Sequence, residues 1–175
     1  LKDCLGGMEL LPGNCIRVMA GVTMARAAVF AANHGLSGLE FAHGIPGTVG
    51  GGVYMNAGAY GGEMSVICRS VTLMDGAGQL REVNARELEF SYRHSKLQES
   101  GGIVISAVLQ LQPAEPEEVK QKMKELQAKR LASQPLDYPS AGSAFKRPAG
   151  GYAAALIDQA GLRGFQVGQA AIAQK

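Results

Sequence analysis

Residues 44–62 read GIPGTVGGGVYMNAGAYGG and hold eight of the 24 glycines in the chain. Because glycine has no side chain, this backbone can come close to a neighbour and adopt positive φ values. Main-chain N–H groups at the start of a helix can also bind an anion such as phosphate. The segment therefore predicts a cradle for a phosphate or a flat cofactor, although glycine clusters also form plain tight turns.

The segment matches neither of the two common phosphate-binding motifs. It contains no Gly-Lys-Ser/Thr sequence after a four-residue gap and no G-x-G-x-x-G pattern. These observations argue against a P-loop NTPase and against a standard dinucleotide-binding fold.

The composition is that of a globular protein without a strongly charged surface. The 175 residues are 46% hydrophobic and carry a formal net charge of +2. A chain of this length can form one domain, or one domain with part of another. Aromatic residues make up 6% and tryptophan is absent, so the stacking platforms that bind single-stranded nucleic acid are not expected. We therefore expect no nucleic-acid partner.

The three cysteines, Cys4, Cys15 and Cys68, lack the close spacing of a zinc site. We expect reduced thiols in a cytoplasmic protein, and no metal site. No segment approaches the roughly 18 consecutive apolar residues of a membrane span, so no membrane association is expected. The chain does not begin with methionine, and it stops in the middle of a sequence pattern at residues 171–175. We therefore expect it to be a fragment of a longer protein. The oligomeric state stays open, with a monomer preferred.

Local patterns predict a mixture of strands and helices. Thr23 is suited to cap a helix, and Pro116 is suited to the first position of a longer one. The predicted strands cover residues 15–20, 66–75, 80–83, 103–111, 142–146 and 165–167. The predicted helices cover residues 24–33, 49–57, 85–90, 116–130 and 151–160. Two prolines within residues 133–140 predict a linker between domains.

Two further segments combine residue types suited to an anionic substrate. Arg93 could pair its planar guanidinium with a carboxylate, or it could be an ordinary surface side chain. Residues 140–148 read SAGSAFKRP, which places two hydroxyls and two cations in nine positions. This string could hold a phosphorylated ligand, or it could be a cationic strand and turn. No Ser/His/Asp triad can be identified, because Ser143 lacks a G-x-S-x-G context.

Together, five motifs resemble the UDP-N-acetylenolpyruvoylglucosamine reductase family, the flavoenzymes that make UDP-N-acetylmuramate for bacterial peptidoglycan. The motifs are GLEF at residues 38–41, GIPGTVGG at 44–51, MNAGAYG at 55–61, YRHS at 92–95 and PSAGSAFKRP at 139–148. They occur in the family's order and at its spacing over essentially the whole chain.

The resemblance implies an α+β fold. Residues 1–133 are expected to be the later part of a PCMH-type FAD-binding domain, and residues 134–175 the start of an α+β substrate-binding domain. The direct run from the strand at 103–111 into the long helix resembles the shorter subtype of the family.

The resemblance also implies roles for individual residues. Arg93 matches the catalytic arginine that holds the enolpyruvyl carboxylate of the substrate, and Ser143 matches the catalytic serine that donates a proton to the adjacent carbon. Arg147 stands where a polar side chain contacts the substrate, and its charge would suit the UDP pyrophosphate. The positions that match FAD-contacting segments are Gly44, Ile45, Pro46, Gly47, Thr48, Gly50, Gly51, Asn56, Gly58 and Ala59.

The implied reaction is the reduction of UDP-N-acetylenolpyruvoylglucosamine to UDP-N-acetylmuramate, with FAD and NADPH as cofactors. Two alternatives are another flavin oxidoreductase of the same fold and a non-catalytic nucleotide-sugar-binding module. The chain departs from the family pattern at Gln169 and Ala173, and the family's upstream Ser-Asn loop and downstream catalytic glutamate lie outside it. We therefore expect this chain by itself to bind FAD weakly or not at all, and to be inactive.

Overall fold

The computed structural model describes residues 4–135, 137–140 and 142–174. It divides into two compact units, Leu1–Gln127 and Ala128–Lys175. The division falls within the helix α5 (Pro116–Ser133). The domain boundary predicted after residue 133 stays a prediction.

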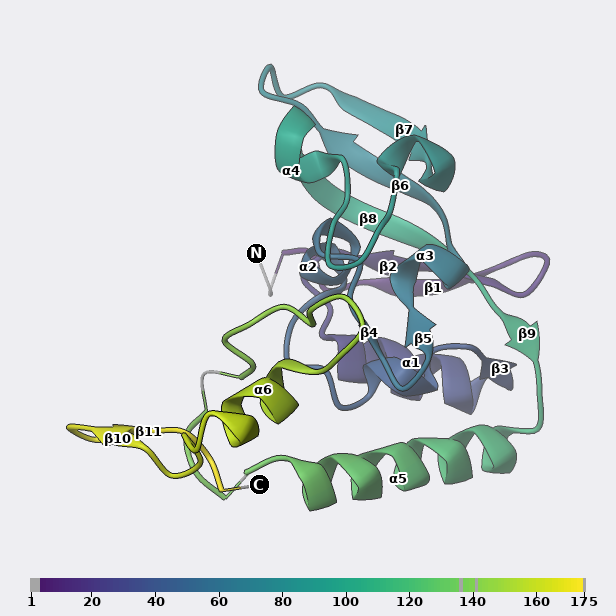
Figure 1. Ribbon diagram of the computed structural model, residues 1–175. Helices are drawn as coiled ribbons and strands as arrows, with labels where there is room; N and C mark the ends of the chain where they lie inside the picture. The colour runs from purple at the N-terminus through teal and green to yellow at the C-terminus, as the bar shows by residue number, and fades with distance from the viewer. Residues whose placement is uncertain (1–3, 136, 141, 175) are drawn as a thin grey trace. The chain divides into compact units, whose positions relative to one another are not determined.

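The first unit is built on one five-stranded antiparallel sheet with the strand order β1-β2-β8-β6-β7 (Figure 1). The strands are β1 (Met8–Leu11), β2 (Cys15–Met19), β8 (Ile103–Gln110), β6 (Cys68–Met74) and β7 (Leu80–Asn84). β6 and β7 form a hairpin, while β8 returns between β2 and β6. The sheet therefore joins segments that are far apart in the sequence.

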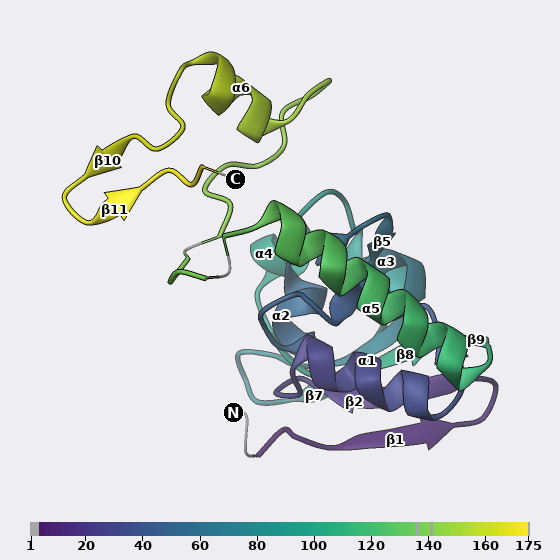
Figure 2. The same cartoon turned by 90° about the horizontal axis from the view of Figure 1, so that it is seen from below.

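Helices and two short strand pairs complete this unit. The helices are α1 (Met24–Asn33), η1 (Glu40–Ala42), α2 (Val49–Tyr54), α3 (Met64–Ile67), η2 (Ala85–Leu88), α4 (Leu97–Ser100) and the part of α5 (Pro116–Ser133) up to Gln127. The strand pairs are β3 (Leu36–Ser37) with β9 (Gln112–Pro113), and β4 (Gly58–Ala59) with β5 (Gly62–Glu63). Figure 2 shows α1, α2 and α5 on one side of the large sheet.

The core lies between the sheet and these helices. Ile16 and Val18 on β2 and Leu109 on β8 are fully buried. Ala27 and Ala31 on α1 are also fully buried, and their small side chains allow the helix to pack closely. The central strands therefore carry the apolar residues that the sequence supplies, which stabilises the fold by removing them from water.

Most predicted elements of the first unit are confirmed. α1 begins after Thr23, whose hydroxyl accepts a hydrogen bond from the Arg26 N–H at 3.2 Å. α5 begins at Pro116, as the missing N–H of proline favours. The strands predicted over residues 15–20, 80–83 and 103–111 correspond to β2, β7 and β8, and the single helical turn predicted over 85–90 corresponds to η2.

Two predictions in this unit are wrong at their ends. The strand predicted from residue 66 begins only at Cys68, because Val66 and Ile67 belong to α3, which is closed by a hydrogen bond from the Cys68 N–H to the Met64 carbonyl. The helix predicted over 49–57 ends at Tyr54. It cannot continue because Asn56 has a φ of 43°.

Beyond the end of α5, the described residues of the second unit form a helix and a hairpin. The helix α6 (Ala153–Gln159) confirms the prediction over 151–160, and it is followed by Gly161 with a φ of 68°. The strand predicted over 165–167 corresponds to β10 (Gln166–Val167), which pairs with β11 (Ala170–Ala171). The strand predicted over 142–146 is wrong: these residues are exposed and form no ladder, and Gly142 has a φ of 78°.

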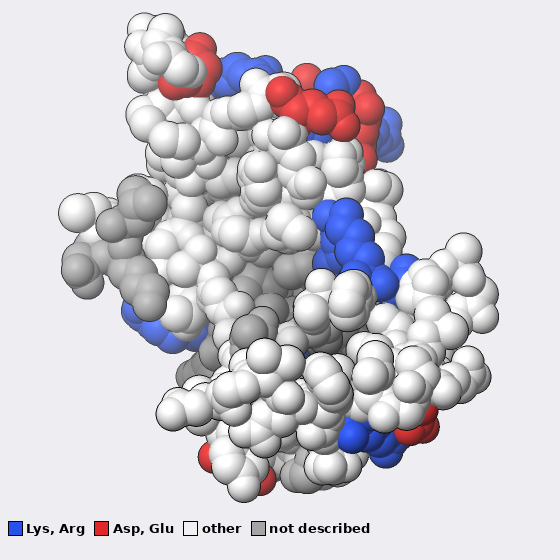
Figure 3. Space-filling model, turned by 60° about the vertical axis from the view of Figure 1, so that its left-hand side comes forward, with Lys and Arg blue, Asp and Glu red and all other residues white. Residues whose placement is uncertain are grey.

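The surface carries charges of both signs. On the face drawn in Figure 3, Lys and Arg side chains and Asp and Glu side chains lie in several groups with uncharged surface between them. Within the described parts of the chain, no helix has both the length and the apolar composition that crossing a membrane requires.

Cys68 on β6 is a buried thiol, and burial raises its pKa from 9.0 to about 12. Because the thiolate is the reactive form, we expect iodoacetamide at about pH 8 to modify the exposed Cys4 and to leave Cys68 intact in the folded protein. Peptide mass spectrometry measures both sites, and unfolding in urea should make Cys68 reactive. Equal modification of the two cysteines in the folded protein would contradict this expectation.

Candidate functional site

α2 is a short helix whose N-terminal end is fixed to the end of β2. The Val49 N–H donates to the Val22 carbonyl at 2.8 Å, and the Gly50 N–H donates to the Ala20 carbonyl at 3.0 Å. The glycine-rich segment that leads into α2 is therefore held against the sheet by main-chain hydrogen bonds.

Some of its glycines are required by packing within the chain. A Cβ on Gly50 would lie 2.8 Å from the Ala20 Cβ and 3.2 Å from the Ala20 carbonyl oxygen. A Cβ on Gly58 would lie 2.7 Å from the Gly62 carbonyl oxygen. Internal packing thus explains the missing side chain at Gly50 and Gly58, and their predicted contact with FAD stays a prediction.

Other parts of the segment are open. Gly47 is exposed with a φ of 146°, and a Cβ there would meet no atom within 4 Å. Within the described residues, the N–H groups of Gly47 and Thr48 have no hydrogen-bond partner. The Thr48 hydroxyl caps α2 by accepting from the Gly51 N–H at 3.4 Å. Unpaired amides beside an open glycine fit a phosphate or a flat ring, so these residues could hold a cofactor such as FAD.

The remaining predicted cofactor positions lie close in sequence to these residues. Gly44 and Ile45 are half-buried, and Ile45 packs against the core. Pro46 is exposed. Ala59 lies in β4 and pairs with Gly62 of β5.

The C-terminal end of α2 receives side chains from residues 95–98. The Ser95 hydroxyl donates to the Tyr54 carbonyl at 2.7 Å, and Gln98 Nε2 donates to the same carbonyl at 3.2 Å. Gln98 Nε2 also donates to the Arg93 carbonyl at 3.3 Å. Since the last carbonyls of a helix have no partner inside it, these bonds dock the segment that carries Arg93 onto α2.

Arg93 lies in a tight turn and reaches back to the chain that follows α2. Ser91 and His94 exchange two main-chain hydrogen bonds of 3.1 Å, and Arg93 between them has a φ of 54°. Its Nη2 donates to the Gly58 carbonyl at 2.7 Å, and its Nη1 donates to the Asn56 carbonyl at 3.4 Å. The structure thus brings together three predicted site residues, Asn56, Gly58 and Arg93.

The charge of Arg93 is not cancelled by a carboxylate. Within the described residues, none of the ion pairs includes Arg93. Carbonyl oxygens orient the guanidinium but carry no net charge, and the two hydrogen bonds use only part of its five N–H donors. The side chain can therefore bind a planar anion such as a carboxylate.

Ser143 and Arg147 belong to the second unit and are described within it. Both are exposed, in an irregular segment that precedes α6. Arg147 Nε donates to the Gly151 carbonyl at 3.1 Å, and its guanidinium lies 3.9 Å from the centre of the Tyr152 ring. The predicted roles of Ser143 and Arg147 toward the substrate stay predictions.

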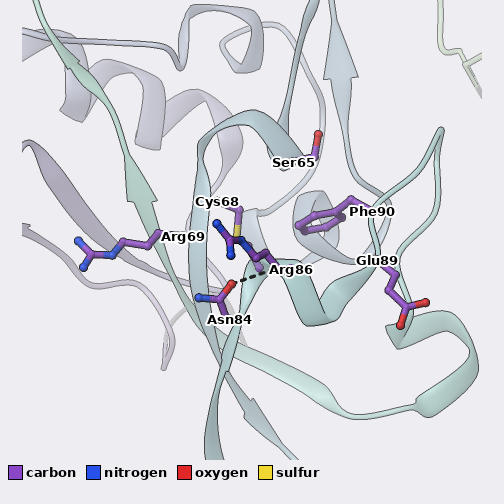
Figure 4. A pocket seen from close by; sticks show the side chains of 8 residues that line it. Ser65, Cys68, Arg69, Asn84, Arg86, Glu89 and Phe90 are labelled. Carbon is purple, nitrogen blue, oxygen red and sulfur yellow. Dashed lines mark hydrogen bonds between the residues drawn. The ribbon is translucent and has the colours of Figure 1, made fainter.

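A cavity of about 610 Å³ lies beside β6, β7 and η2 (Figure 4). Its lining includes Arg69, Arg86 and Glu89, which are exposed, and Cys68, whose thiol has the raised pKa described above. Figure 4 shows that Arg69 points away from the other labelled side chains. The cavity contains no predicted site residue, so we assign it no catalytic role.

A second cavity, of about 570 Å³, is lined partly by residues of the GLEF motif at 38–41. Glu40 in this motif accepts hydrogen bonds from the Gly38 N–H at 2.8 Å and from the Ser37 hydroxyl at 2.6 Å. Both carboxylate oxygens of Glu40 therefore stabilise the local turn, which gives this motif a structural role.

Sequence reasoning missed three residues that build the site: Ser65, Ser95 and Gln98. Ser95 belongs to the YRHS motif, which could have drawn attention to it. Ser65 and Gln98 carry no local signal, because their hydrogen-bond partners Asn56 and Tyr54 are 9 and 44 residues away in the sequence.

Comparisons with known proteins show the family of the chain. Residues 4–84 match the FAD binding domain, and residues 134–175 match the C-terminal domain of UDP-N-acetylenolpyruvoylglucosamine reductase. The reductase of Lactobacillus acidophilus is 51% identical over 158 residues, covering 90% of this chain and 53% of that protein. The reductase of Agathobacter rectalis is 52% identical over 164 residues, covering 93% of this chain and 52% of that protein.

A solved structure gives the same result. The crystal structure of UDP-N-acetylenolpyruvylglucosamine reductase from Thermus caldophilus has a TM-score of 0.82 and 41% sequence identity, and the match covers 90% of this chain and 57% of that chain. The chain spans about half the length of the curated relatives it matches.

The packing at Gly50 predicts a difference between two neighbouring glycines. Gly50→Ala should lower the free energy of unfolding by about 1–3 kcal/mol, because the new methyl group overlaps Ala20. Gly51→Ala should raise it by about 0.5–1 kcal/mol, since its Cβ would meet only the Thr48 hydroxyl at 3.8 Å. Urea unfolding of both variants checks this. Equal changes in the free energy of unfolding would contradict the close approach of Gly50 to Ala20.

Proposed function

The chain belongs to the UDP-N-acetylenolpyruvoylglucosamine reductase family, and from that premise we propose that the full-length protein reduces UDP-N-acetylenolpyruvoylglucosamine to UDP-N-acetylmuramate. Electrons would pass from NADPH through FAD to the enol ether. The product is a precursor of bacterial peptidoglycan. Three free thiols suit a reducing compartment, and we propose a cytoplasmic monomer.

The observation that carries this proposal is the state of Arg93. Its guanidinium is oriented by the carbonyls of Asn56 and Gly58 and keeps its charge. An enolpyruvyl group carries a carboxylate next to the carbon that must accept a proton. A planar guanidinium binds such a carboxylate through two hydrogen bonds and stabilises negative charge on it during the reaction.

FAD, when bound, supplies the hydride transfer to the enol ether. Gly47, Thr48 and Gly51 would hold it, because they present unpaired amides or open backbone at the start of α2. α2 has six residues, about 9 Å at 1.5 Å per residue, so its length separates these residues from the carbonyls that hold Arg93. The same short helix would thus position the cofactor at one end and the substrate carboxylate at the other.

Ser143 would donate the proton to the carbon next to the carboxylate. A hydroxyl is a weak acid at neutral pH, so it can serve only if that carbon has become strongly basic. The charge on Arg147 would then suit the pyrophosphate of the UDP group. Both roles rest on the motif that Ser143 and Arg147 share with the family.

The decisive experiment removes the guanidinium in the full-length protein. Arg93→Ala should lower kcat/KM for the enolpyruvyl substrate by roughly 100- to 1,000-fold, because the charge on the carboxylate loses its partner. Arg93→Lys should be intermediate, since it keeps the charge but lacks the planar fork. NADPH oxidation measures the rate, and flavin absorbance measures the FAD content.

Arg81→Ala is the matched control. Arg81 is exposed on β7, so its removal should leave kcat/KM unchanged. Full activity of Arg93→Ala with normal FAD content would overturn the proposal. UDP-sugar binding by a protein that binds no FAD would instead favour a nucleotide-sugar-binding module.

A further inference from the structure

Asn56 is a fully buried polar residue directly after α2, with no exposed surface and a φ of 43°. The family motif places it among the FAD contacts. Asparagine is one of the few residues that tolerate this backbone conformation. A buried amide must also find hydrogen-bond partners inside the protein, so its partners indicate what it does.

The side-chain amide of Asn56 joins two distant segments. Its Nδ2 donates to the Ser91 carbonyl at 2.9 Å, and its Oδ1 accepts from the Ser65 N–H at 2.9 Å. Both ends of the amide are therefore engaged by the main chain, and the residue is out of reach of solvent. This arrangement favours a contact within the protein over a contact with a ligand.

The main chain of Asn56 holds the same loop at a second point. Its carbonyl accepts from Arg93 Nη1 at 3.4 Å, next to the Gly58 carbonyl that accepts from Arg93 Nη2 at 2.7 Å. Ser91, which the side chain of Asn56 holds, begins the tight turn that carries Arg93. One residue thus contacts both the base of the turn and the guanidinium.

We propose that Asn56 is a positioning residue that fixes the direction of the Arg93 guanidinium, and that its side chain does not bind FAD. The inference rests on the proposed function, because it assigns Asn56 to the carboxylate-binding half of that site. If the amide is removed, the turn of residues 91–94 loses the hydrogen bond from the Asn56 side chain to the Ser91 carbonyl, while the Arg93 guanidinium still ties it to the chain after α2. Arg93 then keeps its charge but samples more orientations, and misplacement of about 1 Å can cost about 100-fold in rate.

The test is Asn56→Gly in the full-length protein. Glycine accepts the positive φ without strain, so this variant removes the two side-chain hydrogen bonds and leaves the backbone conformation accessible. The matched control is Asn14→Gly, because Asn14 also has a positive φ, of 59°, but is exposed in the turn between β1 and β2. Any general effect of replacing asparagine by glycine at positive φ should appear in both variants.

We expect Asn56→Gly to retain FAD and to lower kcat/KM by roughly 10- to 100-fold, while Asn14→Gly matches the unmodified protein. The double variant Asn56→Gly/Arg93→Ala should be no worse than Arg93→Ala alone, since Asn56 acts through Arg93. If Asn56 had only a structural role, the double variant would instead show the loss of kcat/KM of Asn56→Gly in addition to that of Arg93→Ala.

Hydrogen exchange gives a readout that does not depend on activity. The amides of Ser91 and His94 pair with each other's carbonyls, so their exchange should accelerate in Asn56→Gly and not in Asn14→Gly. If Asn56→Gly fails to fold, Asn56→Asp carries the same test, because aspartate keeps the acceptor for Ser65 but lacks the donor for Ser91.

The failures can be told apart. Unchanged activity of Arg93→Ala would overturn the proposed function, and this inference with it. A large loss in Arg93→Ala, together with normal activity of Asn56→Gly or additive losses in the double variant, would overturn only the inference. Loss of FAD from Asn56→Gly would also overturn it, because Asn56 would then contribute to FAD binding.

Discussion

The close approach of α2 to the end of β2 is the constraint on which the site depends. Gly50 makes it possible, because any side chain there would overlap Ala20. With α2 fixed at this distance, its N-terminal end presents the open backbone of Gly47 and Gly51, and the chain beyond its C-terminal end presents carbonyls to Arg93. A short, rigid helix sets the distance between these two parts better than a loop could.

The partners of Arg93 determine what its charge can do. A carboxylate partner would hold the guanidinium firmly, but it would also neutralise it and compete with an anionic ligand. The carbonyls of Asn56 and Gly58 avoid this, because they accept hydrogen bonds without carrying a net charge. The positive φ values of Asn56 and Arg93 are the cost of this geometry, and the surrounding hydrogen bonds maintain them.

Local signals predicted the elements that local interactions define. The Thr23 cap and the first-turn Pro116 mark the starts of α1 and α5, alternating apolar residues mark β2, and a nearly continuous apolar run marks β8. The strand β1 was not predicted, because it is only four residues long and depends on pairing with β2. The strand predicted over 142–146 failed for the related reason that no strand among the described residues pairs with it.

The sequence by itself determined the family and the glycine-rich segment and singled out Arg93 as a candidate, because these depend on residue types in a fixed order. Only the tertiary structure divided the glycines into those that pack and those that stay open, and only it showed that the Asn56 side chain bridges Ser65 and Ser91. The physical reason is that hydrogen bonds between residues 35 positions apart, such as Asn56 and Ser91, leave no pattern in the neighbouring sequence. They exist only once the sheet has brought the two segments together.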